Sequence, residues 1–173
     1  MTDQAQPSGT AQPAVTWELQ PIDGGLRVII RGVIDEYADL RPLLSEIDAP
    51  PILELGEVRR INSLGVKIWV GFIEQLSQRY PTKLARCSPA IVAQLNSVYN
   101  FRGTATIESV LAPFYCERCD VEQLENILTN VKIERPKELL AGQRSCNRCG
   151  GIIEFDDLPD RYFMFAWAIN EAR

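Results

Sequence analysis

The chain of 173 residues contains no histidine. This absence removes the usual general base at neutral pH, and with it the Ser-His-Asp and Cys-His arrangements of many hydrolases. It also removes imidazole from the possible metal ligands. The sequence therefore predicts a protein that is not an enzyme.

Long hydrophobic runs are missing too. No stretch approaches the roughly 20 consecutive apolar residues that a membrane-spanning helix needs. The first 15 residues, MTDQAQPSGTAQPAV, have neither the basic segment nor the apolar core of a secretion signal. We therefore expect a cytoplasmic protein without membrane contacts. Residues 1–14 show no hydrophobic period, which predicts a disordered tail.

Positive charge is scarce, because 18 Lys and Arg residues face 23 Asp and Glu residues. The net charge of −5 gives no broad basic surface for a nucleic acid. Hydrophobic residues make up 46% of the chain and charged residues 24%, which is typical of a globular protein. We expect no nucleic-acid partner.

Strand and helix patterns alternate between residues 15 and 113. The apolar run at 52–55 is typical of a strand buried on both faces. Trp69, Phe72, Ile73 and Leu76 recur at the spacing of one helix face. Ser88 and Pro89 form an N-cap followed by proline, and Asp39 is a candidate N-cap for an earlier helix. The patterns predict strands at 17–20, 26–34, 52–55, 82–87 and 104–111, and helices at 40–47, from the 62–65 turn to Tyr80, and from Pro89 to near Gly103.

The turn Asn62-Ser63-Leu64-Gly65 connects the third predicted strand to the second predicted helix. A phosphate on Ser63 would meet free backbone N–H groups and the positive end of the helix dipole. Alternatively, Asn62 or Ser63 merely caps the helix.

A docking surface for a protein partner is predicted beside this turn. On the helix, Val66, Lys67 and Val70 lie off the core face and on the side of Ser63, so two exposed valines flank a polar turn. Alternatively, the N-terminal tail or the C-terminal module covers the valines. The predicted surface consists of Asn62, Ser63, Leu64, Val66, Lys67 and Val70.

Four of the five cysteines form two C-x-x-C pairs, and Gly150 after the second pair permits a tight turn. Four thiolates without histidine predict a tetrahedral, closed site for zinc. The predicted ligands are Cys116, Cys119, Cys146 and Cys149. The 26 residues between the pairs suit a β-hairpin or a short helix, and the segment resembles a zinc ribbon. The fifth cysteine, Cys87, is predicted to be a buried apolar residue.

Residues 114–173 are therefore predicted to form a small zinc-ribbon-like module that ends in an aromatic segment. Tyr162 to Ile169 is too aromatic to remain in water, so we expect it to pack as a last strand or helix. A contact between two copies of the chain, giving a homodimer, is the alternative use of this segment.

Three stretches resemble the STAS domain, the fold of bacterial anti-sigma factor antagonists. Ile30 to Asp35 resembles the family's second strand, Ile52 to Gly65 its central strand and signature turn, and Ser88 to Gly103 its third helix. The resemblance implies an α/β fold over residues 15–113, a mixed β-sheet with helices packed on it. The family's turn is Asp-Ser-x-Gly, whose serine is phosphorylated by a partner kinase that doubles as the anti-sigma factor.

The resemblance makes Ser63 the phosphoacceptor candidate, with Asn62 in place of the family's aspartate. We therefore expect a bacterial regulatory protein that docks on a protein partner, such as a kinase-type anti-sigma factor, and is switched by phosphorylation. A constitutive scaffold with a structural zinc site and a nucleic-acid-binding zinc ribbon are the alternatives.

Overall fold

The computed structural model of the chain describes residues 15–131 and 135–166. The predicted tail at 1–14 lies outside the described residues, as does the end of the aromatic segment from Trp167 to Ile169. Among the described residues, no helix has the length and apolar character that crossing a membrane requires.

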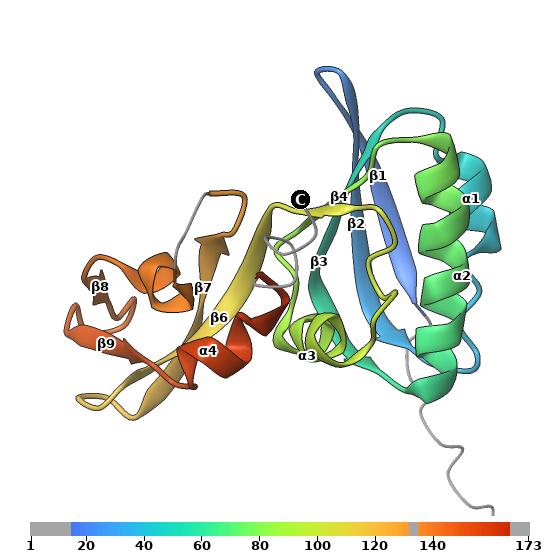
Figure 1. Cartoon of the computed structure of the whole chain (residues 1–173). Coiled ribbons are helices and arrows are strands. Elements are labelled where there is room, and N and C mark those ends of the chain that lie inside the picture. The colour runs from blue at the N-terminus through green and yellow to red at the C-terminus, as the bar shows by residue number, and fades with distance from the viewer. Residues whose placement is uncertain (1–14, 132–134, 167–173) are drawn as a thin grey trace, which may run out of the picture.

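A five-stranded sheet in the order β1-β2-β3-β4-β5 forms the first part of the fold (Figure 1). β1 is antiparallel to β2, and the remaining neighbours are parallel. The prediction of a mixed sheet is therefore confirmed, and its antiparallel pair is the hairpin of β1 and β2. The strands are β1 (Thr16–Ile22), β2 (Gly25–Ile34), β3 (Pro51–Ile61), β4 (Lys83–Ala85) and β5 (Thr106–Ile107).

The third strand differs from its prediction in length and burial. β3 continues to Ile61 because it pairs with β2 as far as Ile34. Its residues alternate between buried and partly exposed positions, so it is buried on one face and not on both. The other face carries ion pairs such as that between Arg27 and Glu54, at 3.2 Å.

Three helices connect these strands: α1 (Arg41–Glu46), α2 (Ser63–Arg79) and α3 (Pro89–Ser97). The predicted core face of α2 is confirmed, because Trp69, Phe72, Ile73 and Leu76 are buried. α1 and α2 lie side by side next to the sheet (Figure 1).

The ends of two helices differ from the predictions. The N-cap of α1 is Leu40, and Asp39 instead accepts hydrogen bonds from the backbone and side chain of Arg41. α3 ends at Ser97 and not near Gly103, because Val98 adopts an extended conformation. Ser88 caps α3 as predicted.

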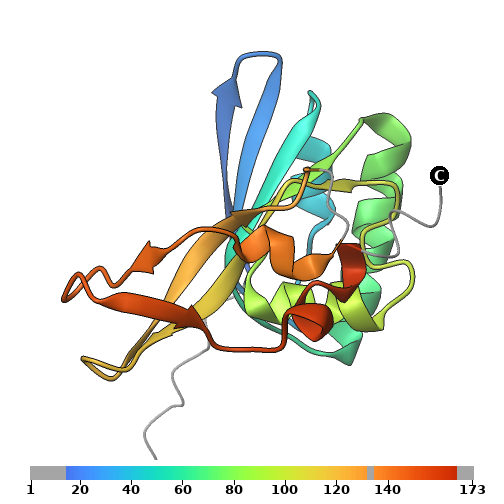
Figure 2. The same cartoon turned by 60° about the vertical axis from the view of Figure 1, so that its left-hand side comes forward.

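A second sheet, in the order β7-β6-β9-β8, follows in the chain. β6 and β7 form a long hairpin that extends away from the first sheet (Figure 2). The predicted strand at 104–111 is divided, because β5 ends at Ile107 and β6 runs on past residue 113. The elements are β6 (Ser109–Cys116), β7 (Val121–Leu128), the 3-10 helix η1 (Pro136–Leu140), β8 (Arg144–Ser145), β9 (Ile152–Phe155) and α4 (Pro159–Tyr162).

The aromatic C-terminal segment joins α3 to the second sheet. Tyr162, Phe163 and Phe165 are buried. The Asn96 side chain of α3 donates to the carbonyl of Tyr162 and accepts from the backbone N–H of Phe165. The Tyr162 hydroxyl donates to the carbonyl of Leu111 in β6. Buried residues of both sheets consequently form one connected hydrophobic core.

Candidate functional site

The four cysteines of the C-x-x-C pairs meet at one point of the second sheet. Cys116 ends β6 and Cys119 lies in the turn before β7, while Cys146 and Cys149 lie in the turn between β8 and β9. Their sulfur atoms all lie within 4.8 Å of one another. The Sγ atoms of Cys116 and Cys149 are 3.6 Å apart, and those of Cys119 and Cys146 are 3.5 Å apart.

These separations fit a single tetrahedral ion. Metal–sulfur bonds of about 2.3 Å in tetrahedral geometry place the sulfurs about 3.8 Å apart. Cys116 and Cys146 are buried, and Cys119 and Cys149 are half-buried, so the cluster is partly accessible to solvent. The four side chains can therefore hold a metal ion without a change of fold.

Two equivalent turns build the cluster. Gly150 and Asp120 each follow the second cysteine of a pair, and both have positive φ angles, of 68° and 52°. The glycine was visible in the sequence, whereas Asp120 was not recognised. The sequence feature that could have indicated this turn is the aspartate itself, because aspartate tolerates the left-handed conformation better than most residues. The backbone of Cys146 bonds to Gly151 and Gly150, which closes the second turn.

The thiols of the cluster differ in acidity. The backbone N–H of Arg148 donates to the Cys146 sulfur at 3.4 Å and lowers the pKa of that thiol to about 6. Desolvation, followed by hydrogen bonds with the neighbouring thiols, raises the pKa of Cys119 to about 12. A divalent cation would offset the repulsion between four thiolates at this distance.

Cys87 lies apart from the cluster and is fully buried, as predicted. Its backbone forms a parallel bridge with Val110 of β6. Burial raises the pKa of its thiol to about 12, so this side chain stays protonated at neutral pH.

The Ser63 turn lies at the carboxyl end of β3, where α2 begins. Asn62 is the N-cap of α2, and its Oδ1 accepts a hydrogen bond from the backbone N–H of Gly65 at 2.8 Å. Ser63 is the first helical residue and is exposed. Within the described part of the chain its hydroxyl makes no hydrogen bond. The cap is thus made by Asn62, and the Ser63 hydroxyl is free for another use.

The Asn62 amide also joins the turn to the end of β2. Its backbone N–H donates to the carbonyl of Ile34 at 3.2 Å, and its Nδ2 donates to Glu36 Oε2 at 2.6 Å. Glu36 accepts from its own backbone N–H as well as from Asn62, and these contacts lower its pKa. Sequence reasoning missed Glu36, because no local pattern connects residues that lie 26 positions apart.

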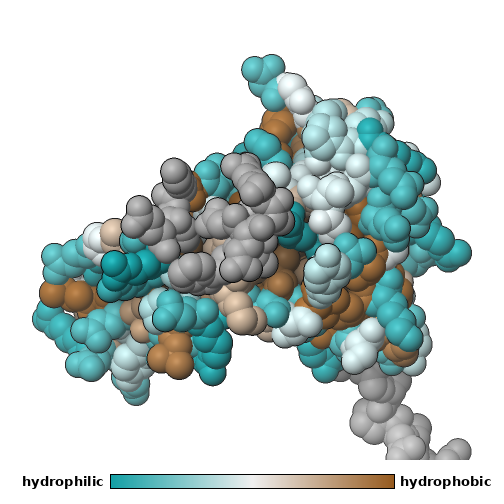
Figure 3. All heavy atoms as spheres, viewed as in Figure 1, coloured by the Kyte–Doolittle hydropathy of each residue, from teal (hydrophilic) through white to brown (hydrophobic). Residues whose placement is uncertain are grey.

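The residues of the predicted docking surface are unequally exposed. Ser63, Leu64 and Lys67 are exposed, with Leu64 at 51%. Val66 and Val70 are half-buried, and Val66 packs against the hydrophobic core. Hydrophobic residues gather between α3 and the Ser63 end of α2 on the face shown in Figure 3.

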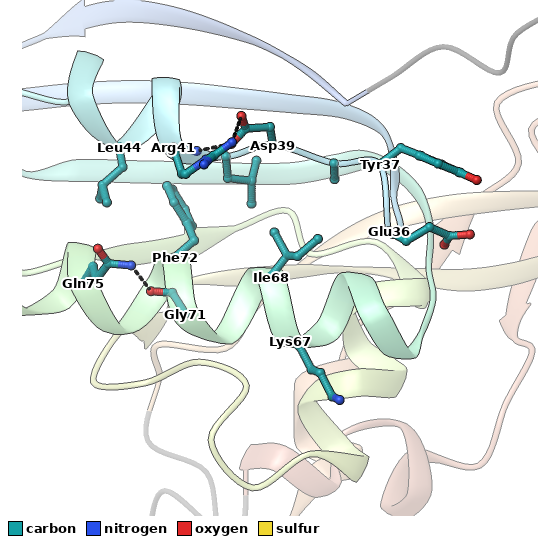
Figure 4. Close-up of a pocket in the computed structure, with 12 residues that line it drawn as sticks. Glu36, Tyr37, Asp39, Arg41, Leu44, Lys67, Ile68, Gly71, Phe72 and Gln75 are labelled. Atoms are coloured by element: carbon teal, nitrogen blue, oxygen red, sulfur yellow. Dashed lines mark hydrogen bonds and ion pairs between the residues drawn. The ribbon is translucent and has the colours of Figure 1, made fainter.

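A groove opens beside the turn, between α2 and the segment 36–41. Its volume is about 500 Å³. Phe72 reaches from α2 toward Leu44 of α1, Ile68 lies closer to the other end, and Glu36 and Tyr37 mark that end (Figure 4). The groove adjoins the Ser63 turn because Glu36 is bonded to Asn62.

The molecule therefore presents two candidate sites, a four-cysteine metal centre in the second sheet and the Ser63 turn with its groove at the first. They belong to different elements, and no side chain takes part in both. No family model matches the chain, and neither a curated protein nor a solved structure matches it.

Proposed function

We propose that this chain is a bacterial regulatory protein that docks on a protein partner through the Ser63 turn, like the anti-sigma factor antagonists that it resembles. The partner would be a kinase-type anti-sigma factor or a related regulatory protein, and phosphorylation of Ser63 would prevent docking. The observation that carries the proposal is the exposed Ser63 hydroxyl at the first residue of a 17-residue helix.

The surroundings of Ser63 suit a phosphate. Backbone N–H groups of the first helical turn and the positive end of the helix dipole favour an anion at this position. Because Asn62 provides the cap, a phosphate on Ser63 replaces no contact that the fold needs. The phosphate adds a charge of roughly −1.5 to −2 at neutral pH to the surface that the partner would cover.

We further propose that the four-cysteine centre holds zinc. Four thiolates in tetrahedral reach, without histidine or carboxylate, are the ligand set of structural zinc sites. Bound zinc would stabilise the outer part of the second sheet, since Ile127 and Ile153 are the buried residues of β7, β8 and β9. A closed site of this kind leaves no coordination position for a substrate.

A constitutive scaffold is the second candidate function, and Asn62 favours it. The Asn62 side chain donates to Glu36 through its nitrogen and caps the helix through its oxygen. An ionised aspartate at this position could still cap the helix, but it has no proton to donate to Glu36. The residue thus has a structural use that is independent of any kinase. In this case Ser63 would carry no phosphate in the native host.

Partner binding by charge variants of α2 tests the proposal. The purified partner, first obtained from the native host with the wild-type chain as bait, is titrated with Ser63→Ala and Ser63→Asp. Gln78→Glu is the matched control, since it adds one negative charge at an exposed position near the far end of the same helix. We expect Ser63→Asp to weaken binding at least about tenfold, while the two other variants bind like the wild type.

Equal binding by Ser63→Asp and the wild type would contradict the switch. Mass spectrometry of the chain isolated from its host separates the two candidate functions. Phosphate on Ser63 supports the regulatory protein, and its complete absence under all growth conditions supports the scaffold.

A further inference from the structure

Two contacts between sulfur atoms cross from one cysteine turn to the other. The first turn carries Cys116 and Cys119, and the second carries Cys146 and Cys149. The Sγ atoms of Cys116 and Cys149 lie 3.6 Å apart. Those of Cys119 and Cys146 lie 3.5 Å apart. Since a disulfide bond measures about 2.05 Å, each pair has to approach by only roughly 1.5 Å to become one.

Each crossing contact joins an accessible sulfur to a buried one. Cys119 and Cys149 are half-buried, whereas Cys116 and Cys146 are buried. Both turns lie at the end of the second sheet that points away from the first sheet (Figure 2). Gly151 leaves space beside one accessible sulfur, because a Cβ at this position would lie 3.3 Å from the Cys149 Sγ. A small reagent in solution therefore reaches one sulfur of each contact, while its partner waits behind it.

The two turns are held face to face by contacts that do not involve sulfur. In the second turn, the backbone N–H of Cys146 donates to Gly151 at 2.7 Å, and that of Gly150 donates to Cys146 at 2.9 Å. In the first turn, the Tyr115 hydroxyl donates to Asp120 at 2.5 Å. The strands that flank the turns, β6 and β9, pair with each other. The sulfurs can therefore change their bonding without a change in the strands that carry them.

Disulfides across the turns would also stabilise the fold more than disulfides within a turn. The crossing pairs join residues that are 33 and 27 positions apart. The two cysteines of one C-x-x-C pair are only three positions apart. Because a disulfide removes more entropy from the unfolded chain when it closes a longer loop, the crossing pairs are favoured. They would connect the same two turns that a shared metal ion connects.

We infer that the cluster is a reversible redox centre, in which a peroxide converts the four thiolates into two disulfides across the turns and the metal ion is released. The disulfides join Cys116 to Cys149 and Cys119 to Cys146. The released ion rests on the proposed zinc centre, whereas the choice of sulfur pairs rests on the distances alone. The oxidised chain stays folded, because the disulfides replace the connection that the metal made.

Two molecules of hydrogen peroxide account for every atom and electron of the reaction. A half-buried thiolate attacks one peroxide oxygen, the O–O bond breaks and hydroxide leaves, which yields a sulfenic acid. The buried thiolate of the same contact then attacks the oxidised sulfur, the S–O bond breaks and a second hydroxide leaves. Each peroxide thus takes two electrons from two thiolates. Solvent protons neutralise the hydroxide, and zinc, without its ligands, leaves as the hydrated Zn²⁺ ion.

Peroxide treatment of the zinc-loaded full chain tests the inference. A chelating dye follows zinc release, a thiol reagent in denaturant counts the remaining thiols, and mass spectrometry of unreduced peptides identifies the disulfides. We expect zinc to be released in step with the loss of the four cluster thiols, with both crossing disulfides formed. Cys87 is the internal control and should remain the one free thiol. Dithiothreitol with added zinc should restore the starting state.

Three double variants separate the effect of position from the chemistry of cysteine. Cys116→Ser with Cys149→Ser keeps one crossing contact, and Cys119→Ser with Cys146→Ser keeps the other. Cys146→Ser with Cys149→Ser keeps only the two cysteines of the first turn. All three lack half of the cluster and are compared in the same chelator-containing buffer. We expect the first two to form their disulfide at least about tenfold faster than the third.

Melting temperatures compare three states of the wild-type chain: zinc-loaded, oxidised, and reduced with a chelator. Both the metal ion and the crossing disulfides stabilise the folded chain relative to the unfolded one. We therefore expect the zinc-loaded and oxidised chains to melt cooperatively and at higher temperatures than the reduced, metal-free chain. This measurement needs no variant, so it holds even where a double variant does not fold.

Disulfides within the turns, Cys116–Cys119 and Cys146–Cys149, would overturn the inference, as would sulfinic acids without any disulfide. Unfolding of the oxidised wild type, or equal rates in the three double variants, would do the same. If the isolated chain holds no zinc but its thiols form the crossing disulfides, only the proposed zinc centre fails. If zinc and all four thiols survive peroxide, the zinc centre stands and the redox inference fails.

Discussion

The backbone of Gly65 lies directly against the carbonyl oxygen of Ile34, so a side chain at position 65 would collide with the end of β2. The same carbonyl accepts the backbone N–H of Asn62. The first turn of α2 is therefore fixed to the neighbouring strand at two points. This close approach explains why the Ser-x-Gly part of the turn requires its glycine.

Alanine at the two α2 glycines should change stability in opposite directions. Gly65→Ala forces the helix and β2 apart and should lower the free energy of unfolding by about 1–3 kcal/mol. Gly71→Ala meets no atom and improves helix propensity, so it should raise the same quantity by about 0.5–1 kcal/mol. Urea denaturation measures both, and equal effects of the two changes would refute this account of the turn.

The Asn62 cap can be separated from its contact with Glu36. Asn62→Ala removes both and should cost about 1 kcal/mol of stability. Asn62→Asp keeps the acceptor for Gly65 but sets a carboxylate against Glu36, so the pKa of Glu36 should rise above its wild-type value.

NMR titration of the Glu36 side chain tests this. Because the wild-type pKa is lowered, the contact stabilises the fold above the ordinary pKa of glutamate, and this stabilisation is lost as the pH falls through the lowered value. An unchanged Glu36 pKa in Asn62→Asp would show that the hydrogen bond does not persist in solution.

Metal analysis should find one zinc ion per chain. Cys116→Ser should abolish zinc binding and lower the melting temperature, whereas Cys87→Ala, the matched cysteine control outside the cluster, should keep the metal. Since thiols release protons when they bind metal, zinc affinity should fall as the pH is lowered. Retention of zinc by Cys116→Ser would mean that the cluster is not the site.

Burial makes Cys87 inert toward thiol reagents. In the zinc-loaded native chain, maleimide at about pH 8 should leave Cys87 unmodified and should label it only after unfolding. The thiol has a pKa of about 12 in the fold against an ordinary 9.0. Its contribution to stability is therefore complete below about pH 9 and is lost as the pH rises toward about 12.

Comparison of the wild type with Cys87→Ala isolates this effect. The stability difference between the two should shrink between about pH 8 and about pH 11. A constant difference over this range would mean that the thiol is not desolvated.

Local signals in the sequence were sufficient for much of the first sheet and for the four-cysteine cluster. Ser88 and Pro89 mark the start of α3, and the spacing of Trp69, Phe72 and Leu76 gives the buried face of α2. The pairs of cysteines identify the cluster, because a two-residue spacing has few other uses in a chain of this composition.

Contacts between distant residues could not be read in this way. The length of β3 follows from its pairing with β2, and the division of residues 104–111 follows from the second sheet, which competes for the same strand. Glu36 enters the Ser63 turn through a hydrogen bond to Asn62 that no periodicity reveals. Helix ends were equally difficult, because Val98 leaves the helix without a glycine or proline to mark the place.

β6 belongs to both halves of the molecule. Its first residues bond to Cys87, which is followed by the Ser88 cap of α3, and its last residue is Cys116 of the four-cysteine cluster. A single strand thus connects the four-cysteine cluster to the start of α3, and its buried residues belong to the core that both sheets share. If the cluster holds zinc as we propose, loss of the ion should destabilise both sheets together, and a cell that limits zinc would thereby limit the amount of folded protein.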